Sequence, residues 1–480
     1  MNKKIFFSFS STQLKNMSLE KRMLMFDKYL DRTNMTHHQY QKDGVRWILS
    51  NELNKKPLCG VRGGFIADEM GLGKTIMMIG AMLCNFVNKT LIIVPPALIE
   101  QWYNQIARTT GHKSIIYHGE NKKTITLADL QSAKIVITTY GAISIPQKLT
   151  LIHRVIWDRL IFDEAHHLRN SDTKLYFRTR LIRSSIRWLV SGTPIQNRKK
   201  DFYNLCKMIR IPVSYYTNLD NLKELTRAFI LKRTKKQVGI ILPDLVQDKV
   251  IVDWGNIREM ELSQEIHSAL AFSNVSSYKN NGALNNLNGT LPILLRARQT
   301  CILPRLLSKV VGNYMQYNEA FNCSSKLDNV INKILARKDN CAGKLIFCHF
   351  REEIDEIANR LRNAGITSVA TFDGRTNDAK RIQILSQAFQ ILILQIQTGC
   401  EGLNLQEHYS EIYFISPHWN PSIEDQAIAR CHRIGQTKIV YVDRFEMCEF
   451  KNHHETMNIE KYVNSVQDFK RETTKTIMEA

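Results

Sequence analysis

Short apolar runs alternate with helical patterns in two separate series along the chain. The first series extends from about Gln39 to Asn197, and the second begins near Ser325. Each run is a few residues long and is bounded by glycine, proline or polar residues, which is typical of strands in a parallel sheet covered by helices. The runs are Thr90–Val94, Ser114–Tyr117, Lys134–Thr138, Arg159–Phe162, Trp188–Ser191, Lys344–Cys348, Ser368–Thr371, Ile391–Gln395, Glu411–Ile415 and Ile439–Val442. We therefore expect an α/β protein with two lobes, each a parallel sheet flanked by helices.

The stretches around the two series suggest the domain organisation. A chain of 480 residues is too long for one compact core, so two or three domains are expected. The expected parts are a polar lead-in at 1–36, a first lobe at 37–240 with a helical insertion at about 198–230, a linker with a further helical insertion at 241–324, a second lobe at 325–450 and a C-terminal helix at 451–480.

The composition excludes several classes of protein. The ten cysteines are scattered without a C-x-x-C pair, so neither a zinc ribbon nor a disulfide framework is expected. No run of about eighteen apolar residues occurs, and the N-terminus lacks the apolar stretch of a signal peptide. We expect an intracellular protein that does not bind a membrane.

The charge balance suggests a polyanionic partner. Lys and Arg number 66 and Asp and Glu number 45, which leaves a formal net charge of +21. A nucleic acid would neutralise such a surface through its phosphates and release counterions. The alternative, a protein merely kept soluble by surface lysines, stays open on composition alone.

A glycine-rich segment between an apolar run and an apolar helix is the strongest local signal. Glycines allow a tight turn in which backbone N–H groups and a helix N-terminus face a phosphate. A lysine at the end of such a turn reaches the β- and γ-phosphates, and the following threonine can hold magnesium. The segment consists of Asp68, Glu69, Met70, Gly71, Leu72, Gly73, Lys74 and Thr75. An aspartate stands where the usual pattern begins with glycine.

A second signal is the tetrapeptide Asp163, Glu164, Ala165 and His166, which ends the apolar run Arg159–Phe162. Carboxylates at the C-terminal end of a parallel strand lie where such sheets bind ligands. Asp163 is a candidate for holding magnesium, and Glu164 is a candidate for polarising the attacking water. Alone, two adjacent acids would be only a solvated turn; downstream of a phosphate loop they predict a nucleotide-hydrolysing site.

Two further segments carry candidate residues. Ser191, Gly192 and Thr193 lie at the end of another expected strand, where they form either an ordinary turn or a relay from the nucleotide to nucleic-acid movement. In the second lobe, Arg430 and Arg433 are three residues apart and would share one face of a helix. Two guanidinium groups there could act on a γ-phosphate as arginine fingers do.

Taken in order, these segments resemble the Swi/Snf family of superfamily-two ATPases, and the resemblance covers about Gln39 to Phe445. The segment Tyr40–Trp47 is similar to the family's Q motif, and Leu91–Leu98 with Trp102 is similar to the next motif. Further matches are Thr138–Tyr140, Phe229–Lys236 with Leu242–Pro243 at the junction between the lobes, Gly402–Leu405, Trp419–Pro421 and Asp425–Gln436. Leu294–Cys301 is similar to the subgroup of lodestar-type factors and repair translocases, here without a RING insert.

The resemblance implies two RecA-like lobes, with ATP and Mg²⁺ as cofactors. It assigns adenine recognition to Gln41, catalytic roles to Lys74, Asp163, Glu164, Arg430 and Arg433, and the metal to Thr75 and Asp163. It implies coupling of ATP hydrolysis to movement through Ser191, Gly192, Thr193 and Gln436. Contacts with DNA are implied for Thr139, Asn404 and Trp419.

The function implied is ATP-dependent movement along double-stranded DNA that displaces or remodels bound proteins, without strand separation. The DNA would be held by its phosphate backbone with little sequence preference, and a larger complex is possible as a partner. Nuclear localisation is expected, or a viral factory or virion if the source is a large DNA virus. The alternatives are a DExH-type RNA or DNA helicase, an inactive nucleic-acid-binding scaffold, and the motor subunit of a transcription-termination complex.

Overall fold

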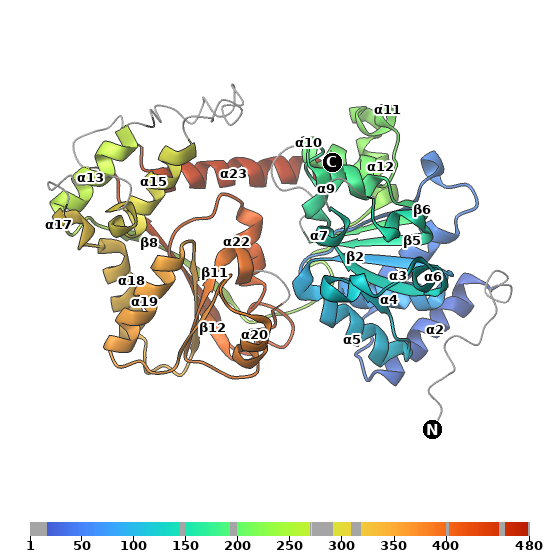
Figure 1. The fold of residues 1–480 in the computed structure, drawn as a ribbon, viewed down its shortest axis with the longest axis horizontal. Coiled ribbons are helices and arrows are strands. Elements are labelled where there is room, and N and C mark those ends of the chain that lie inside the picture. The colour runs from blue at the N-terminus through green and yellow to red at the C-terminus, as the bar shows by residue number, and fades with distance from the viewer. Residues whose placement is uncertain are drawn as a thin grey trace. The chain divides into compact units, whose positions relative to one another are not determined.

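The computed structural model describes residues 17–144, 149–192, 199–268, 270, 291–308, 318–399, 403–450 and 457–478, and Figure 1 shows their helices and strands. The chain divides into two compact units. The first is Met1–Ile241 together with Thr473–Ala480, and the second is Leu242–Glu472. None of the described helices is both long enough and apolar enough to cross a membrane.

In the described residues, the first unit contains a seven-stranded sheet with the order β3-β4-β2-β5-β6-β1-β7, and its paired strands are all parallel. The strands are β1 (Arg62–Ile66), β2 (Thr90–Val94), β3 (Ile115–Tyr117), β4 (Ile135–Thr139), β5 (Ile156–Asp163), β6 (Arg183–Val190) and β7 (Ile230–Leu231). The helices are α2 (Leu19–Arg32), α3 (Gln39–Leu53), α4 (Lys74–Cys84), α5 (Ile99–Thr110), α6 (Leu127–Ser132), α7 (Tyr140–Ile143), α8 (Leu151–Arg154), α9 (Lys174–Arg180), α10 (Lys199–Met208), α11 (Val213–Tyr216) and α12 (Leu222–Phe229).

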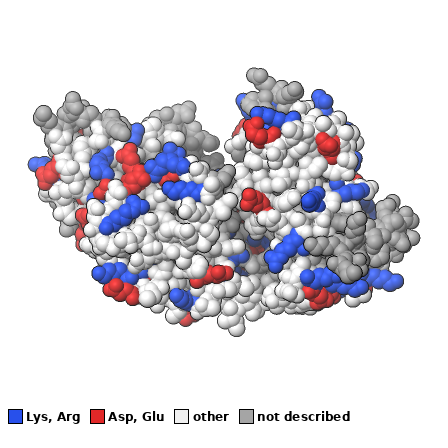
Figure 2. All heavy atoms as spheres, turned by 60° about the horizontal axis from the view of Figure 1, so that its bottom comes forward, with Lys and Arg blue, Asp and Glu red and all other residues white. Residues whose placement is uncertain are grey.

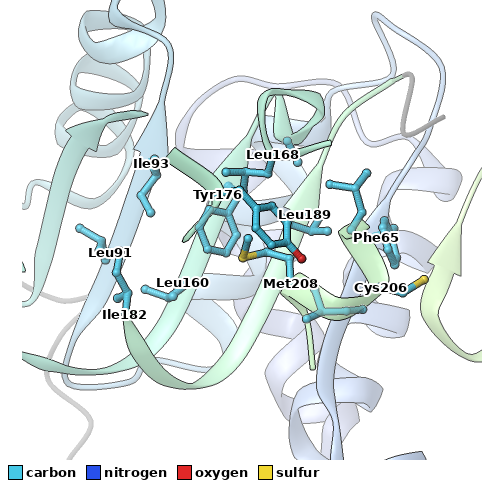
Figure 3. Close-up of a cluster of buried hydrophobic side chains, with 14 of the residues drawn as sticks. Phe65, Leu91, Ile93, Leu160, Leu168, Tyr176, Ile182, Leu189, Cys206 and Met208 are labelled. Atoms are coloured by element: carbon cyan, nitrogen blue, oxygen red, sulfur yellow. The ribbon is translucent and has the colours of Figure 1, made fainter. Parts of the chain in front are cut away.

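Two hydrophobic cores, one on each face, bury this sheet. Along β2, Leu91 and Ile93 belong to one core, whereas Ile92 and Val94 belong to the other. Figure 3 shows part of the first core, which includes residues of the strands β1, β2, β5 and β6 together with Tyr176 of α9. Because successive side chains of a strand point to opposite faces, burial of both faces requires an unbroken apolar run, as the sequence has here.

The second unit contains, in the described residues, a six-stranded parallel sheet with the order β10-β11-β9-β12-β13-β8. The strands are β8 (Leu245–Val252), β9 (Gly343–Cys348), β10 (Val369–Phe372), β11 (Ile391–Gln395), β12 (Tyr409–Phe414) and β13 (Val440–Met447). The helices are α13 (Ile257–Ser268), α15 (Leu291–Ile302), α17 (Asn318–Phe321), α18 (Ser325–Ala336), α19 (Arg351–Asn363), α20 (Asp378–Leu385), α21 (Ile396–Gly399), α22 (Pro421–Ile428) and α23 (Ile459–Met478), of which α23 continues past Glu472.

The second sheet is also buried on both faces. Leu345 and Phe347 of β9 face one core, and Ile346 and Cys348 face the other. The predicted α/β class, with two parallel sheets flanked by helices, is confirmed, and each predicted apolar run overlaps a strand.

One strand lies where the sequence predicted a linker and helices. Within 241–324, residues Leu245–Val252 form β8, the edge strand of the second sheet, which pairs only with β13 among the described strands. Most side chains of β8 are exposed or half-buried. An edge strand of this kind has no continuous apolar run, which is why its pattern did not indicate a strand.

Candidate functional site

The phosphate loop predicted from the sequence connects β1 to α4. Gly71 and Gly73 both have positive φ values, of 92° and 78°. A Cβ on Gly73 would lie 2.5 Å from the side-chain nitrogen of Gln41, so this position accepts only glycine without displacement. Lys74 begins α4, and its ammonium group donates hydrogen bonds to the carbonyl oxygens of Asp68 (2.9 Å) and Glu69 (3.4 Å). The lysine is thereby folded back over the loop at a helix N-terminus, which favours anions.

Gln41, predicted to recognise adenine, lies against the same loop. Its side chain is buried in α3, and its amide donates to the carbonyl oxygen of Leu72 (3.4 Å) and to the hydroxyl of Tyr40 (3.3 Å). The structure therefore brings Gln41 to the C-terminal end of the phosphate loop, about thirty residues away in sequence.

The two predicted acids lie at the C-terminal end of β5. The indole N–H of Trp102 donates to Asp163 Oδ2 (2.7 Å), and the backbone N–H of Glu164 donates to Asp163 Oδ1 (3.0 Å). Burial raises the pKa of Asp163 to about 7, the Glu164 carboxylate adds to the rise, and Trp102 and the Lys74 ammonium act against it. Because β1, β6 and β5 are neighbouring parallel strands, the phosphate loop that follows β1 and Asp163 at the end of β5 lie at the same edge of the sheet.

Glu164 has a left-handed backbone conformation, with φ at 49°. One of its carboxylate oxygens lies 3.3 Å from Nδ1 of His166, whose ring stacks on that of His167. Non-glycine residues in this conformation are uncommon and concentrate at functional sites. Ala165 and His166 of the predicted tetrapeptide are buried in the turn that follows.

The Ser-Gly turn after β6 completes this edge of the sheet. The backbone N–H of Ser191 donates to the carbonyl oxygen of Ile66 (3.1 Å), and its hydroxyl lies 3.5 Å from Nδ1 of His166. A Cβ on Gly192 would lie 3.4 Å from the Lys74 ammonium nitrogen and 2.9 Å from the Met70 side chain. Gly192 therefore lies against the phosphate loop and Ser191 against His166 of the tetrapeptide, whereas Thr193 lies outside the described residues.

Thr139 ends β4 and is fully buried. Its hydroxyl accepts a hydrogen bond from the backbone N–H of Ala142 (3.2 Å), which caps α7, and lies 3.0 Å from Nδ1 of His118. In this conformation the Thr139 side chain holds the turn and is not exposed to a ligand.

The arginine pair of the second unit is not on a helix, which corrects the sequence prediction. Helix α22 ends at Ile428, and Arg430 and Arg433 lie in the turns that follow. Burial, followed by the charge of Arg430, lowers the pKa of Arg433. Within the described residues, the buried Nε of Arg430 has no hydrogen-bond partner. Such a group is costly unless a ligand satisfies it.

Three further predicted residues lie in the second unit. Arg433 donates a hydrogen bond to the exposed side chain of Asn404. Gln436 is buried, and its amide donates to Tyr409 O at the start of β12 (3.0 Å) and accepts from the N–H of Thr437 (3.0 Å). Trp419 is half-buried and packs edge-on against Tyr462 of α23.

Arg233 is a functional candidate to which the sequence assigned no role, since it appeared there only as part of the segment Phe229–Lys236. Its guanidinium pairs with the fully buried carboxylate of Asp68 at the start of the phosphate loop. The available signal was the aspartate that replaces the first glycine of the loop, since a buried acid requires a partner.

Two family models match the chain. The family model "SNF2-related domain" matches residues 40–306, and the model "Helicase conserved C-terminal domain" matches residues 325–435. A "Probable global transactivator" of Orgyia pseudotsugata multicapsid polyhedrosis virus is 27% identical over 478 residues, which cover 92% of this chain and 91% of the relative.

A plant relative and a solved structure are also similar. The "ATP-dependent DNA helicase DDM1" of Arabidopsis thaliana is 27% identical, over 91% of this chain and 63% of its own length. The Sulfolobus solfataricus SWI2/SNF2 ATPase core in complex with dsDNA is 24% identical with a TM-score of 0.40, covering 92% of this chain and 93% of its own.

Proposed function

The chain belongs to the SNF2-related family of ATP-hydrolysing enzymes, with two RecA-like lobes, and from this premise we propose that it is a motor that moves along double-stranded DNA. One observation carries the proposal: the phosphate loop, the acids Asp163 and Glu164 and the turn at Ser191 meet at one edge of the first sheet. That arrangement suits hydrolysis of a nucleoside triphosphate.

The roles proposed in the first unit follow from the chemistry of each group. Lys74 and the loop N–H groups bind the phosphates, and Gln41 reads the adenine edge. Glu164 orients and polarises the attacking water. Gly192 and Ser191, which lie against Lys74 and His166, transmit the state of the site to the rest of the unit.

The residues present also fit Mg²⁺. The Thr75 hydroxyl and the Asp163 carboxylate are hard oxygen donors, and Mg²⁺ sites at phosphates use only one or two protein ligands of this kind. When bound, the ion neutralises charge on the β- and γ-phosphates. Asp163 holds it best as the carboxylate, which the Trp102 N–H and the Lys74 ammonium favour.

In the second unit, we propose that Arg430 and Arg433 stabilise the charge that develops on the γ-phosphate. The Nε of Arg430, which has no hydrogen-bond partner among the residues that the structure describes, supports this role, because an oxyanion would satisfy it. Because the two arginines belong to the other unit, hydrolysis would depend on how the units approach, and this dependence would couple ATP turnover to movement.

Double-stranded DNA is the proposed track, held by its phosphates with little sequence preference. The net charge of +21 supports a polyanionic partner. On the face shown in Figure 2, basic and acidic side chains are interspersed among the described residues of both units. The proposed DNA contacts include Asn404 and Trp419, and Thr139 would act by shaping its turn.

The proposed cellular role is the displacement or remodelling of DNA-bound proteins during transcription, repair or chromatin maintenance, alone or within a larger complex. A nuclear location or a viral factory would suit this role. The similarity to a viral transactivator and to a plant DNA helicase supports both possibilities.

ATP turnover by the purified protein tests the proposal. It should be measured without nucleic acid and with duplex DNA, single-stranded DNA and duplex RNA. We expect duplex DNA to stimulate turnover at least tenfold, and Glu164→Gln to abolish it while the exposed Glu120→Gln control does not. Stimulation only by RNA or single strands would replace the proposal with a helicase function, and absence of turnover under every condition would contradict it.

A further inference from the structure

The segment Leu231–Lys235, which we call the strap, lies along the first half of the phosphate loop. It extends the parallel pairing of β1 with β7, in which Ile66 is the partner of Leu231. Beyond that pair, the N–H of Ala67 donates to Leu231 O (2.7 Å), and the N–H of Glu69 donates to Arg233 O (2.9 Å). The beginning of the loop is therefore held like the edge of a sheet.

Arg233 fastens the strap to the loop through its side chain. Its Nε and Nη2 donate to the two carboxylate oxygens of Asp68, at 3.1 and 2.5 Å. The Asp68 side chain is completely buried, and that of Arg233 is 17% exposed. A two-pronged pair of this kind fixes orientation as well as distance, and a lysine could not reproduce it.

The same guanidinium also reaches helix α3. Its Nη1 donates to the carbonyl oxygen of Tyr40, and the group lies 5.6 Å from the centre of the Tyr40 ring. The next residue, Gln41, donates to Leu72 O at the other end of the loop (3.4 Å). Arg233 therefore links the start of the loop directly to the residue pair that contacts its end.

A second ion pair supports the attachment. The backbone N–H of Lys235 donates to a carboxylate oxygen of Glu69 (2.8 Å), and the Lys235 ammonium lies 3.0 Å from the other oxygen. The Lys235 side chain is 11% exposed, so this pair is partly shielded from water. Two consecutive acids of the loop are thus each bound by a basic residue of the strap.

We propose that Arg233 is a positioning residue for the nucleotide: by holding Asp68 and Tyr40 it keeps the phosphate loop and Gln41 in their binding arrangement and thereby sets nucleotide affinity. The inference rests on the proposed binding of ATP at this loop. A loop that is already ordered loses less conformational freedom when a ligand binds, which raises affinity. The chain leaves the first unit six residues after Lys235, so the strap also ties the phosphate loop to the connection with the second unit.

The test separates positioning from stability. Arg233→Met leaves the buried Asp68 carboxylate without its partner, which destabilises the fold in any case. The double variant Asp68→Asn with Arg233→Met removes both charges and should recover the thermal midpoint while keeping the loop unfastened. Lys236→Met, at an exposed lysine just beyond the strap, is the matched control.

Binding of a fluorescent ADP analogue (mant-ADP) without DNA is the readout, alongside the thermal midpoint. We expect the affinity for mant-ADP to fall at least tenfold in Arg233→Met and to remain at least tenfold below the wild type in the double variant. The affinity of Arg233→Lys should lie between these variants and the wild type, and that of Lys236→Met should be unchanged. Full recovery of mant-ADP affinity in the double variant would show that Arg233 has only a structural role and would overturn the inference. Wild-type affinity in Arg233→Met would also overturn it. Failure of the wild-type protein to bind mant-ADP would overturn the proposed function together with this inference.

Discussion

At the scale of single residues, burial decides the chemistry of several ionisable groups. Glu52 of α3 is fully buried, and its carboxylate pairs with Arg159 of β5 and accepts a hydrogen bond from the Trp188 indole (2.8 Å). Lys326 and Glu460 form a comparable buried pair in the second unit. In each pair a side chain of opposite charge inside the protein offsets the cost of burial.

His267 of α13 gives a prediction about pH. Burial lowers the pKa of His267 to about 4, and its Nδ1 hydrogen-bonds to the carbonyl oxygen of Ser263 (2.7 Å). Below about pH 6.5, the imidazole of His267 therefore binds a proton more readily in the unfolded chain than in the native protein. Above pH 6.5, the neutral His267 makes its full contribution to the free energy of unfolding. This contribution, about 3 kcal/mol, is lost as the pH falls toward about 4.

Urea unfolding between pH 4 and 7.5 measures this linkage. His267→Gln should lose about 3 kcal/mol less stability over that range than the wild type. The exposed His408→Gln in the same unit serves as the control for removal of a histidine. An unchanged pH dependence in His267→Gln would show that His267 does not titrate as described.

At the scale of elements, α23 supports the loop that carries Trp419. Gln467 of this helix donates to the carbonyl oxygen of His418 and to Glu424 (2.8 Å), and Lys470 donates to the carbonyl oxygen of Trp419 (2.6 Å). A helix distant in sequence from the Trp-Asn-Pro motif thus holds its backbone in place.

This support predicts the effect of loosening the loop. The double variant Gln467→Leu with Lys470→Met should lower DNA-stimulated ATP turnover about five- to tenfold, equivalent to about 1–1.4 kcal/mol, because Trp419 would no longer be held for DNA. Turnover without DNA should stay within twofold of the wild type. Lys475→Met, at an exposed lysine of the same helix, is the control. Equal loss with and without DNA would argue against a role of this loop in DNA contact.

At the scale of the whole molecule, the net charge of +21 is the property that most affects association with a polyanion such as DNA. If DNA is bound mainly through phosphates, six or more neutralised phosphates would lower the affinity for duplex DNA by about 10³-fold between 50 and 200 mM salt. Fluorescence anisotropy with two duplexes of unrelated sequence checks this. Their affinities should agree within about threefold, and mant-ADP affinity should hardly change with salt. A shallow salt dependence would contradict a phosphate-dominated contact.

The sequence by itself determined the α/β class and the two lobes, and it indicated the segments of the proposed nucleotide site. Strands buried on both faces need continuous apolar runs, and a phosphate loop needs glycines at positions of positive φ, as Gly71 and Gly73 show. Local pattern carries both kinds of information, because each depends on neighbouring residues alone.

Only the tertiary structure decided which distant groups meet. The pairing of Arg233 with Asp68 joins residues 165 positions apart, and that of Gln41 with Leu72 depends on how α3 packs. The edge strand β8 and the turn that holds Arg430 and Arg433 also escaped prediction, since exposed strands lack an apolar run and a spacing of three residues is not proof of a helix. Long-range contacts depend on how whole helices and strands pack together, and local sequence patterns do not show this packing.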